Sequence, residues 1–481
     1  MSALADRSAV ARGRRAVLIG LILTMGLAAM DTTIVATAIP IVVRDLGGFS
    51  LFAWVFSAYV LAQVVSIPVY GRLADFYGRK RLLILGTIVF LGGSMLSGLA
   101  WSMVSLIAFR GLQGLGAGAI QALVYTVAGD LYDVRERGRI QGWLSSVWGI
   151  SAVLGPLLGG ALAEYASWRW IFFINVPLGI AALIVISTRL HEQVTPRRHS
   201  IDYGGALLMV GGVGLLVFGL LQGGVAWSWT SRASVGVFAG ALALLAAFAW
   251  CETRVAEPIA PPWMIRGRLM ATTNAATVGL GLLIIALSEF LPTYLQGVYR
   301  TSAIVAGLCL ATMSITWPIM SALSARLYLR LGFRDPALLG AGLTLSAGLM
   351  FALTPSSAPF WSSALESAVM GAGLGLISTP VLVGLQSVVA WEQRGSVTGA
   401  NMFSRYLGQT VGAAIAGSIA NASLPPNLHN ISSAIASGPV SPRVRAALDA
   451  ATHNVFWALV AAAVLCVVAL AVTPRHFSSP I

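Results

Sequence analysis

The sequence predicts an all-α membrane protein with fourteen transmembrane helices, arranged as two related six-helix bundles and two inserted helices. Hydrophobic residues make up 57% of the 481 residues and charged residues only 10%, whereas a soluble domain has about 25% charged residues. Apolar runs of about 20 residues, the length of a helix that crosses a bilayer, recur along the chain. Three glycines spaced two residues apart also recur, which indicates an internal repeat: Gly114, Gly116 and Gly118 return as Gly371, Gly373 and Gly375.

The first half is predicted to hold six spans. Asp31 interrupts the first apolar run, and the following Ala36-Thr37-Ala38 superficially resembles a signal-peptide cleavage site. Because the run is long and Asp31 directly precedes that site, we interpret it as a retained span. The predicted ranges are 16–38, 52–70, 82–100, 104–127, 140–163 and 170–187.

Two further spans, 203–221 and 234–250, follow a charged cytoplasmic link at 189–202. They have no counterpart in the repeat, so we interpret them as an insertion. The loop between them holds Trp227 and Trp229, a residue type that favours the membrane–water interface.

The second half begins after a proline-rich link at 257–264. Its predicted spans are 272–294, 303–323, 337–353, 361–385, 397–420 and 455–472, and the long polar segment 421–453 is predicted to lie outside, with a short helix at 442–451. The predicted domains are therefore an N-terminal bundle at 1–190, an inserted pair at 191–258 and a C-terminal bundle at 259–481. Repeated halves of this kind are typical of secondary transporters, whose binding site lies between the halves near the bilayer midplane.

The net charge of +13 is distributed as a membrane protein requires. Of the 30 Lys and Arg residues, two fall within predicted spans and six in outside loops, and the others are predicted to be cytoplasmic. This asymmetry sets membrane orientation, so we expect a multi-pass protein of the cytoplasmic membrane with both termini cytoplasmic and no nucleic-acid partner. The six outside residues are Arg44, Arg169, Arg232, Arg300, Arg443 and Arg445.

Five ionisable side chains fall within predicted spans, where each costs about 2.5–3.5 kcal/mol to insert. We expect them to face a cavity or one another, and we predict that they couple protons and attract substrate charge. A purely structural role at a helix end, or in binding backbone carbonyls, is the alternative for each. The five are Asp31, Arg110, Glu289, Glu366 and Arg405. The repeat offset places Glu289 opposite the residue next to Asp31, and Glu366 opposite the residue next to Arg110.

A polar and aromatic cavity lining is also predicted. Arg110, Gln113, Gln121 and Tyr125 share one helical face, and aromatic rings attract soft cations by cation–π contact. A packing role is the alternative for each ring. The predicted lining comprises Trp54, Tyr59, Gln113, Gln121, Tyr125, Trp148 and Phe290.

Two motifs indicate moving parts. The segment 71–81 joins two spans on the cytoplasmic side, where Asp75 among basic residues can pair in one conformation and release in another. We predict a cytoplasmic gate made of Gly71, Asp75, Gly78 and Arg79, with Gly78 in the left-handed turn after a helix. The second motif comprises Gly155, Pro156, Gly159 and Gly160. Its proline removes one backbone hydrogen bond of the helix, and its glycines let a neighbouring helix approach closely.

The residue patterns of the sequence exclude an enzyme active site. The only lysine, Lys80, is followed by Arg81, so no phosphate-binding P-loop exists, and the glycine run at Gly114 lies inside a span with no preceding strand. The five histidines fall in predicted loops or tails, and no His/Cys/carboxylate cluster has metal-ligand spacing. The three cysteines lie in or beside apolar runs and imply no disulfide framework. We expect no cofactor, and a proton gradient as the energy source.

These motifs resemble those of the major facilitator superfamily. Residues 71–80 resemble its GxLaDrxGrk loop, and residues 106–116 resemble its lxxxRxxqGxga helix with Arg110 at the arginine. Gly155-Pro156 with Gly159-Gly160 is similar to the GPxxGG motif of its drug:proton antiporters. Residues 31–40 resemble the LDxTIVNVALP element of the fourteen-span branch, although Ala36-Thr37-Ala38 replaces its usual Asn-Val-Ala, and residues 168–177 are typical of the same branch. The second half matches more loosely.

The resemblance implies a major facilitator fold, alternating access and export driven by inward proton flow. It assigns Asp31 to coupling or substrate charge, Arg110 to proton coupling, Asp75 to the cytoplasmic gate and Gly155-Pro156 to an antiporter-type bend. We therefore predict a proton-coupled antiporter that exports lipophilic, often cationic drugs, with protons and membrane lipid as its other partners. Export of an endogenous lipid, siderophore or metabolite is the alternative within the same fold. A non-transporting membrane sensor and a symporter remain further options.

Overall fold

A computed structural model describes residues 2–48, 51–192, 202–224, 226–255, 257–261, 263–264, 267–423, 442–475 and 477, with only the backbone for residues 2–12. The described chain is helical apart from an isolated bridge between Gly223 and Trp227. By length and composition, 13 of its helices can cross a membrane. The helix Arg394–Ser423, which covers the predicted span 397–420, is the fourteenth long helix. The all-α prediction is confirmed.

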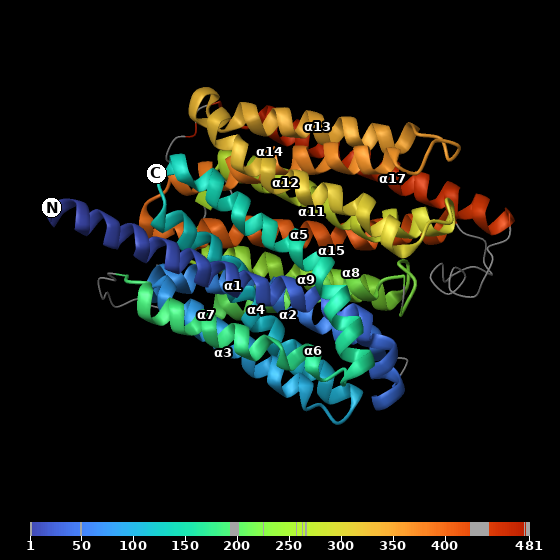
Figure 1. Ribbon diagram of the computed structural model, residues 1–481, viewed down its shortest axis with the longest axis horizontal. Coiled ribbons are helices and arrows are strands. Elements are labelled where there is room, and N and C mark those ends of the chain that lie inside the picture. Colours follow the sequence, from blue (N-terminus) through green and yellow to red (C-terminus); the bar gives the residue numbers. More distant parts are fainter. Residues whose placement is uncertain are drawn as a thin grey trace. The chain divides into compact units, whose positions relative to one another are not determined.

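The chain forms two compact units (Figure 1). The first comprises Met1–Phe218, Gly236–Ile265 and Gln386–Phe403, and the second comprises Gly219–Val235, Arg266–Leu385 and Ser404–Ile481. The helices of the first half are α1 (Ser2–Leu46), α2 (Phe52–Tyr77), α3 (Arg79–Gly98), α4 (Met103–Leu131), α5 (Val134–Tyr165), α6 (Trp170–Phe173) and α7 (Asn175–Arg189). The inserted pair is α8 (Tyr203–Gln222) and α9 (Arg232–Glu252). The second half holds α11 (Arg268–Gly297), α12 (Ala303–Leu331), α13 (Arg334–Leu353), α14 (Ser362–Ser387), a 3₁₀ turn at Trp391–Gln393, α15 (Arg394–Ser423) and α17 (Pro442–Val472).

In the first unit, α4 packs tightly between α2 and α3 through three glycines. A Cβ atom on Gly114 would collide with the Tyr59 carbonyl of α2, and one on Gly118 would collide with the Ser66 side chain of the same helix. A Cβ atom on Gly116 would lie 2.6 Å from the Gly86 carbonyl oxygen of α3. The spacing of two residues therefore alternates the contacts between the two neighbouring helices, and only glycine permits both approaches.

The second unit repeats this arrangement. A Cβ atom on Gly371 or Gly375 would collide with α12, at Met313 or Trp317, while one on Gly373 would lie 2.7 Å from the carbonyl oxygen of Gly340 in α13. Thus α14 is packed between α12 and α13 as α4 is between α2 and α3. The repeat predicted from the glycine pattern is a repeat of helix packing.

Carboxylates at one end of each inserted helix bind nearby backbone N–H groups. Asp202 accepts a hydrogen bond from the backbone N–H of Gly205 at 2.8 Å, which caps the start of α8. Glu252, the last residue of α9, accepts hydrogen bonds from the backbone N–H groups of Ile259 and Ala260. Most of α8 and α9 belongs to the first unit, whereas residues 219–235, which comprise the loop between them and the adjoining ends of both helices, belong to the second. The predicted domain boundaries at 190 and 258 stay predictions.

Several helices extend beyond the apolar runs that predicted them. The helix α1 begins at Ser2 and ends at Leu46, because polar helix ends continue into water without an apolar signal. Within the predicted outside segment 421–453, α15 continues to Ser423 and α17 begins at Pro442 as one 31-residue helix. The predicted short helix at 442–451 is therefore the first part of α17. Which of the residues 421–453 lie outside the membrane stays a prediction. Residues 424–441 of that segment, and 193–201 of the charged link, lie outside the described residues.

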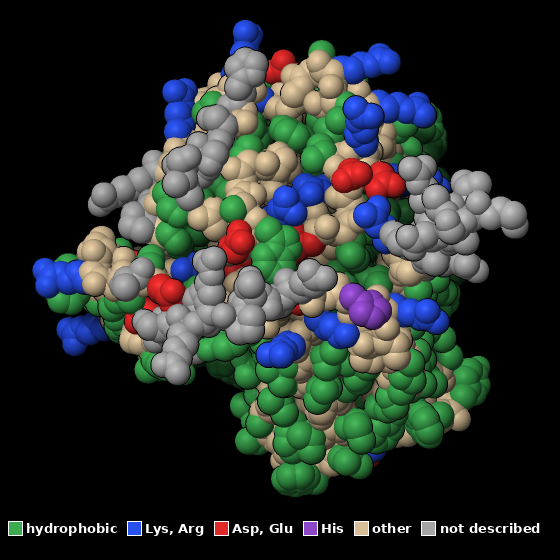
Figure 2. Space-filling model, turned by 90° about the vertical axis from the view of Figure 1, so that its left-hand side faces the viewer, with side chains coloured by type: hydrophobic (Ala, Val, Ile, Leu, Met, Phe, Trp, Pro, Cys, Tyr) green, Lys and Arg blue, Asp and Glu red, His purple; other side chains and the backbone are tan. Residues whose placement is uncertain are grey.

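Figure 2 shows Lys and Arg side chains at several places on the face that it draws. Which side of the membrane each helix end faces stays a prediction from the distribution of Lys and Arg residues.

Candidate functional site

A buried ion pair joins α1 to α4 within the first unit. Arg110 Nη1 lies 2.5 Å from Asp31 Oδ2, and the two side chains are 1% and 0% exposed. The sequence analysis expected these charges to face a cavity or one another, and the structure pairs them directly.

Neutral polar groups complete the pair. The Gln113 amide donates a hydrogen bond to Asp31 Oδ1 at 2.8 Å and accepts one from Arg110 Nη1 at 2.7 Å. The amide of Asn175 on α7 lies 3.5 Å from Asp31 Oδ1 and donates to the Ser94 hydroxyl of α3 at 3.0 Å. Both carboxylate oxygens of Asp31 therefore have partners, which a buried charge requires.

Aromatic rings enclose the guanidinium. The Arg110 Cζ atom lies 4.1 Å from the centroid of the Tyr59 ring and 5.9 Å from that of Phe172, and Arg110 Nε donates to the Val55 carbonyl at 3.3 Å. The faces of aromatic rings attract a cation, more strongly where water is excluded. In this conformation the surrounding residues shield the pair from solvent.

The predicted cavity lining is mostly packed. Gln113, Gln121, Tyr125 and Tyr59 are all buried, and Gln121 Nε2 has no hydrogen-bond partner among the described residues. The Trp54 ring packs on Phe218 of α8 with centroids 5.7 Å apart, and Trp148 is half-buried. Of the seven predicted lining residues, Phe290 lines the described cavity in the second unit.

The other three intramembrane charges lie in the second unit and are not joined to one another by a hydrogen bond or ion pair between described residues. Glu366 is 2% exposed and accepts a hydrogen bond from the Thr354 hydroxyl at 2.7 Å. Arg405 is half-buried, with Cζ 4.9 Å from the centroid of the Trp317 ring. Glu289 is exposed.

One titratable group near Glu366 was missed in the sequence. His453 was assigned to an outside loop, but it lies within α17, where Nδ1 is 3.2 Å from Asp449 Oδ1 and Nε2 is 3.1 Å from the Thr354 carbonyl oxygen. Both partners are acceptors, so both ring nitrogens donate only when the imidazole is doubly protonated. The spacing of four residues between Asp449 and His453 indicates this pair once α17 is known to be one helix.

Asp75 of the predicted cytoplasmic gate binds the first turn of α15, a contact that we call the latch, and all its residues belong to the first unit. Asp75 of α2 accepts hydrogen bonds from the backbone N–H groups of Gly395 and Ser396, both at 2.8 Å, and from the Ser396 hydroxyl at 2.6 Å. A carboxylate at this position satisfies free N–H groups and complements the positive end of the helix dipole. A Cβ atom on Gly71 would lie 2.7 Å from the Gly395 carbonyl oxygen, so Gly71 permits this close approach.

Arg79 extends the latch. It lies 3.0 Å from Asp75 Oδ1 and 3.2 Å from Asp130 Oδ2, and its Cζ atom is 3.5 Å from the centroid of the Trp391 ring. Arg394 binds the other oxygen of Asp130 at 3.0 Å. Gly78 has the predicted positive φ, at 90°, although its ψ of 151° lies outside the left-handed helical region.

The second glycine motif packs α5 against α1. A Cβ atom on Gly155 would collide with the Thr33 hydroxyl, and one on Gly159 would lie 2.6 Å from the Ile34 carbonyl oxygen. Pro156 is exposed within α5, and nothing in the described structure lies within 4 Å of a Cβ atom placed on Gly160. The motif therefore holds α5 close to the part of α1 that follows Asp31.

The sequence matches the family model described as Major Facilitator Superfamily over residues 21–201 and 188–413. It is 36% identical over 404 residues to Multidrug resistance protein 3 of Bacillus subtilis (strain 168), covering 84% of this chain and 79% of that protein. It is 33% identical over 414 residues to Multidrug transporter protein MdtP of the same organism, covering 85% and 76% of the two chains.

Solved structures share the fold at low identity. The human organic anion transporter MFSD10 (TETRAN) aligns with a TM-score of 0.65 and 15% identity over 96% of this chain and 99% of that chain. The proton:xylose symporter XylE aligns with a TM-score of 0.66 and 12% identity over 95% of each chain.

Proposed function

Because this chain belongs to the Major Facilitator Superfamily, we propose that it is a proton-coupled antiporter that exports lipophilic, often cationic drugs across the cytoplasmic membrane by alternating access. It is a multi-pass membrane transporter, and we propose no enzymatic role for it. The relatives named as multidrug resistance and multidrug transporter proteins support the drug as cargo. We propose that both termini are cytoplasmic, from the distribution of Lys and Arg residues.

The observation that carries the proposal is the buried pair of Asp31 and Arg110. A proton on Asp31 removes the negative charge that Arg110 needs as its partner, so protonation and pairing compete for one carboxylate. Breaking such a pair from one side costs about 3–5 kcal/mol. A conformation that admits water to Asp31 therefore exchanges a proton at the expense of the pair, and this links proton transfer to the change of conformation.

The latch at Asp75 supplies the second part of the cycle. It holds the first turn of α15 against α2 through three hydrogen bonds to one carboxylate. We propose that these bonds form when the cytoplasmic side is closed and break when it opens to receive cargo.

The experiment is gradient-driven transport of ethidium and a panel of drugs by purified protein in proteoliposomes. An imposed pH gradient drives transport by the wild-type protein, whereas Asp31→Asn abolishes this gradient-driven transport because its side chain cannot bind and release a proton. Asp45→Asn is the matched control on the same helix, since Asp45 is 52% exposed in its pair with Arg169, and it retains transport.

Full gradient-driven transport by a folded Asp31→Asn protein contradicts the role of Asp31 in coupling. Transport of no compound in the panel by the wild-type protein contradicts drug export.

A further inference from the structure

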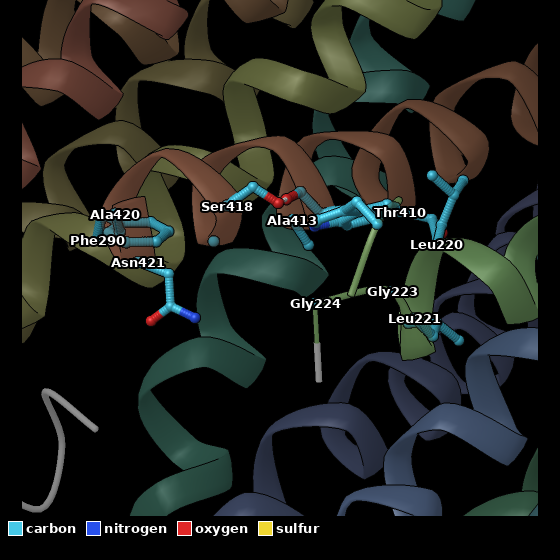
Figure 3. A pocket seen from close by; sticks show the side chains of 13 residues that line it. Leu220, Leu221, Gly223, Gly224, Phe290, Thr410, Ala413, Ser418, Ala420 and Asn421 are labelled. Atoms are coloured by element: carbon cyan, nitrogen blue, oxygen red, sulfur yellow. Dashed lines mark hydrogen bonds between the residues drawn. The ribbon is translucent and has the colours of Figure 1, made fainter. Parts of the chain in front are cut away.

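The loop between the inserted helices closes one side of a cavity in the second unit. The cavity has a volume of about 440 Å³ and lies among the end of α8, the following loop, α11 and α15 (Figure 3). Sites for drug-sized molecules commonly measure about 300–1,000 Å³. Its lining comprises Leu220, Leu221, Gly223, Gly224, Trp229, Phe290, Thr410, Ala413, Ala414, Gly417, Ser418, Ala420 and Asn421.

The apolar part of the cavity combines small residues with two aromatic rings. Small residues of α15 form one side, and no described residue lies within 4 Å of a Cβ atom placed on Gly417. The rings of Phe290 and Trp229 contribute from two other elements. Aromatic walls over a surface of small residues suit a planar ring system.

Two glycines of the loop leave the space in which the Trp229 ring lies. A Cβ atom on Gly223 would lie 2.5 Å from the Trp229 ring, and one on Gly224 would lie 2.8 Å from the indole nitrogen. Gly224 also has a φ of 75°, which favours glycine, and its N–H donates to the Trp227 carbonyl at 2.8 Å. Two glycines are therefore needed to seat the indole against the turn.

The polar side-chain groups that line the cavity are the hydroxyls of Thr410 and Ser418, the amide of Asn421 and the indole N–H of Trp229. The hydroxyls of Thr410 and Ser418 donate to backbone carbonyls of their own helix, at 3.0 Å and 2.7 Å, so they offer lone pairs to a ligand. Cβ atoms on Gly408 and Gly412 of α15 would meet Val278, Leu282 and Ile285 of α11.

Glu289 is the next residue on this face of α11, because it follows Ile285 by four positions and Leu282 by seven. It directly precedes Phe290, and its side chain is exposed. A carboxylate at the junction of α11 and α15 complements a positively charged ligand.

We propose that this cavity binds a planar aromatic cation and that the inserted helix pair serves to place Trp229 in its wall. The inference rests on the proposed function for its cargo class and assigns a site to that cargo. It also gives a role to two helices that have no counterpart in the repeat.

The test is equilibrium binding of ethidium to purified protein without a pH gradient, followed by fluorescence. Gly417→Leu fills the open space and raises the Kd on the order of tenfold or more. Gly307→Leu adds the same side chain at another position, outside the cavity, where no described residue lies within 4 Å of the Cβ atom, and it leaves the Kd unchanged. Thermal unfolding checks that both variants are folded.

Two further variants test the chemistry of the walls. Trp229→Ala weakens ethidium binding, whereas Trp229→Phe restores most of it because an aromatic face remains. Glu289→Gln raises the Kd by about fivefold, as expected for loss of one partly solvated ion pair.

An unchanged Kd in folded Gly417→Leu overturns the proposal, and so does release of copurified phospholipid by that variant with ethidium binding intact, which identifies a lipid site. Absence of ethidium binding to the wild-type protein also overturns it. The proposed function is decided separately, by gradient-driven transport of the drug panel and its dependence on Asp31.

Discussion

Asp31 and Arg110 could each be singled out in the sequence, but their contact with each other could not. Each charge stands out because a membrane span carries few charges, and the resemblance to known motifs gives each a role. Their contact joins residues 79 positions apart on different helices, and Asn175 approaches from a third helix. The groups that surround the pair are fixed by packing alone.

At the scale of residues, the energetic coupling of the pair is testable with Asp31→Asn, Arg110→Gln and the double variant. Each single change leaves one buried group without its charged partner, so we expect each to lower the free energy of unfolding by about 3–5 kcal/mol. The double variant removes both charges, so its loss is smaller than the sum of the two single losses. Unfolding by SDS titration in mixed micelles measures all three.

The same cycle built on Asp45 and Arg169 is the control, because that pair is 52% and 34% exposed. Its coupling energy is about 1 kcal/mol or less. Additive losses at Asp31 and Arg110 contradict the direct pairing of these two side chains.

Other charged residues that the sequence singled out have different surroundings in the structure. Glu366 bonds to Thr354, Arg405 lies over Trp317, and Glu289 is exposed. The cost of inserting a charge indicates that each needs a partner or water, but it does not identify which. Their roles in proton coupling stay predictions.

At the scale of helices, the glycine triplets explain why the repeat is visible in the sequence. In both units the outer two glycines face one neighbour and the middle glycine faces the other. Replacement of any of them inserts a Cβ atom into a backbone. Glycine therefore persists at these positions while the side chains around them differ between the two halves.

Gly116→Ala tests this packing. Its Cβ atom would lie 2.6 Å from the Gly86 carbonyl oxygen and 2.6 Å from Phe90 Cα, both backbone atoms that cannot rotate away. We expect a loss of about 1–3 kcal/mol in the free energy of unfolding, typical of overpacking, with a lower Tm in detergent.

Gly111→Ala is the matched control on α4, because no atom of the described chain lies within 4 Å of its Cβ position. It is expected to be neutral or to stabilise the helix by up to about 1 kcal/mol. Equal effects of the two variants contradict close packing as the reason for the glycine at position 116.

At the scale of the whole molecule, the latch joins segments from the two halves of the sequence, since Asp75 belongs to the first half and the turn that it caps to the second. A single carboxylate that holds a helix terminus can release it without unfolding either helix. The latch is therefore a contact that can form and break during transport.

Asp75→Asn tests the latch in the transport cycle. The amide loses the charge that complements the end of α15 and keeps one acceptor oxygen for its N–H groups. We expect the transport rate to fall by about tenfold while the Kd for ethidium changes little, which stopped-flow efflux and equilibrium binding measure separately.

Asp133→Asn is the control, because Asp133 is an exposed residue before α5 and makes no side-chain capping bond. It leaves both quantities unchanged. Loss of binding with an unchanged transport rate contradicts the gate.

The sequence by itself determined the class of the protein, its helices and its internal repeat, because apolar length and glycine spacing are local properties of the chain. It also predicted functional roles for Asp31, Arg110 and Asp75, and these roles stay predictions. Only the tertiary structure decided that Asp31 and Arg110 are one closed pair, that Asp75 caps α15, and that Trp229 and Phe290 share a cavity. Those relations depend on which helix faces meet, and that is fixed by the packing of many side chains rather than by any one stretch of sequence.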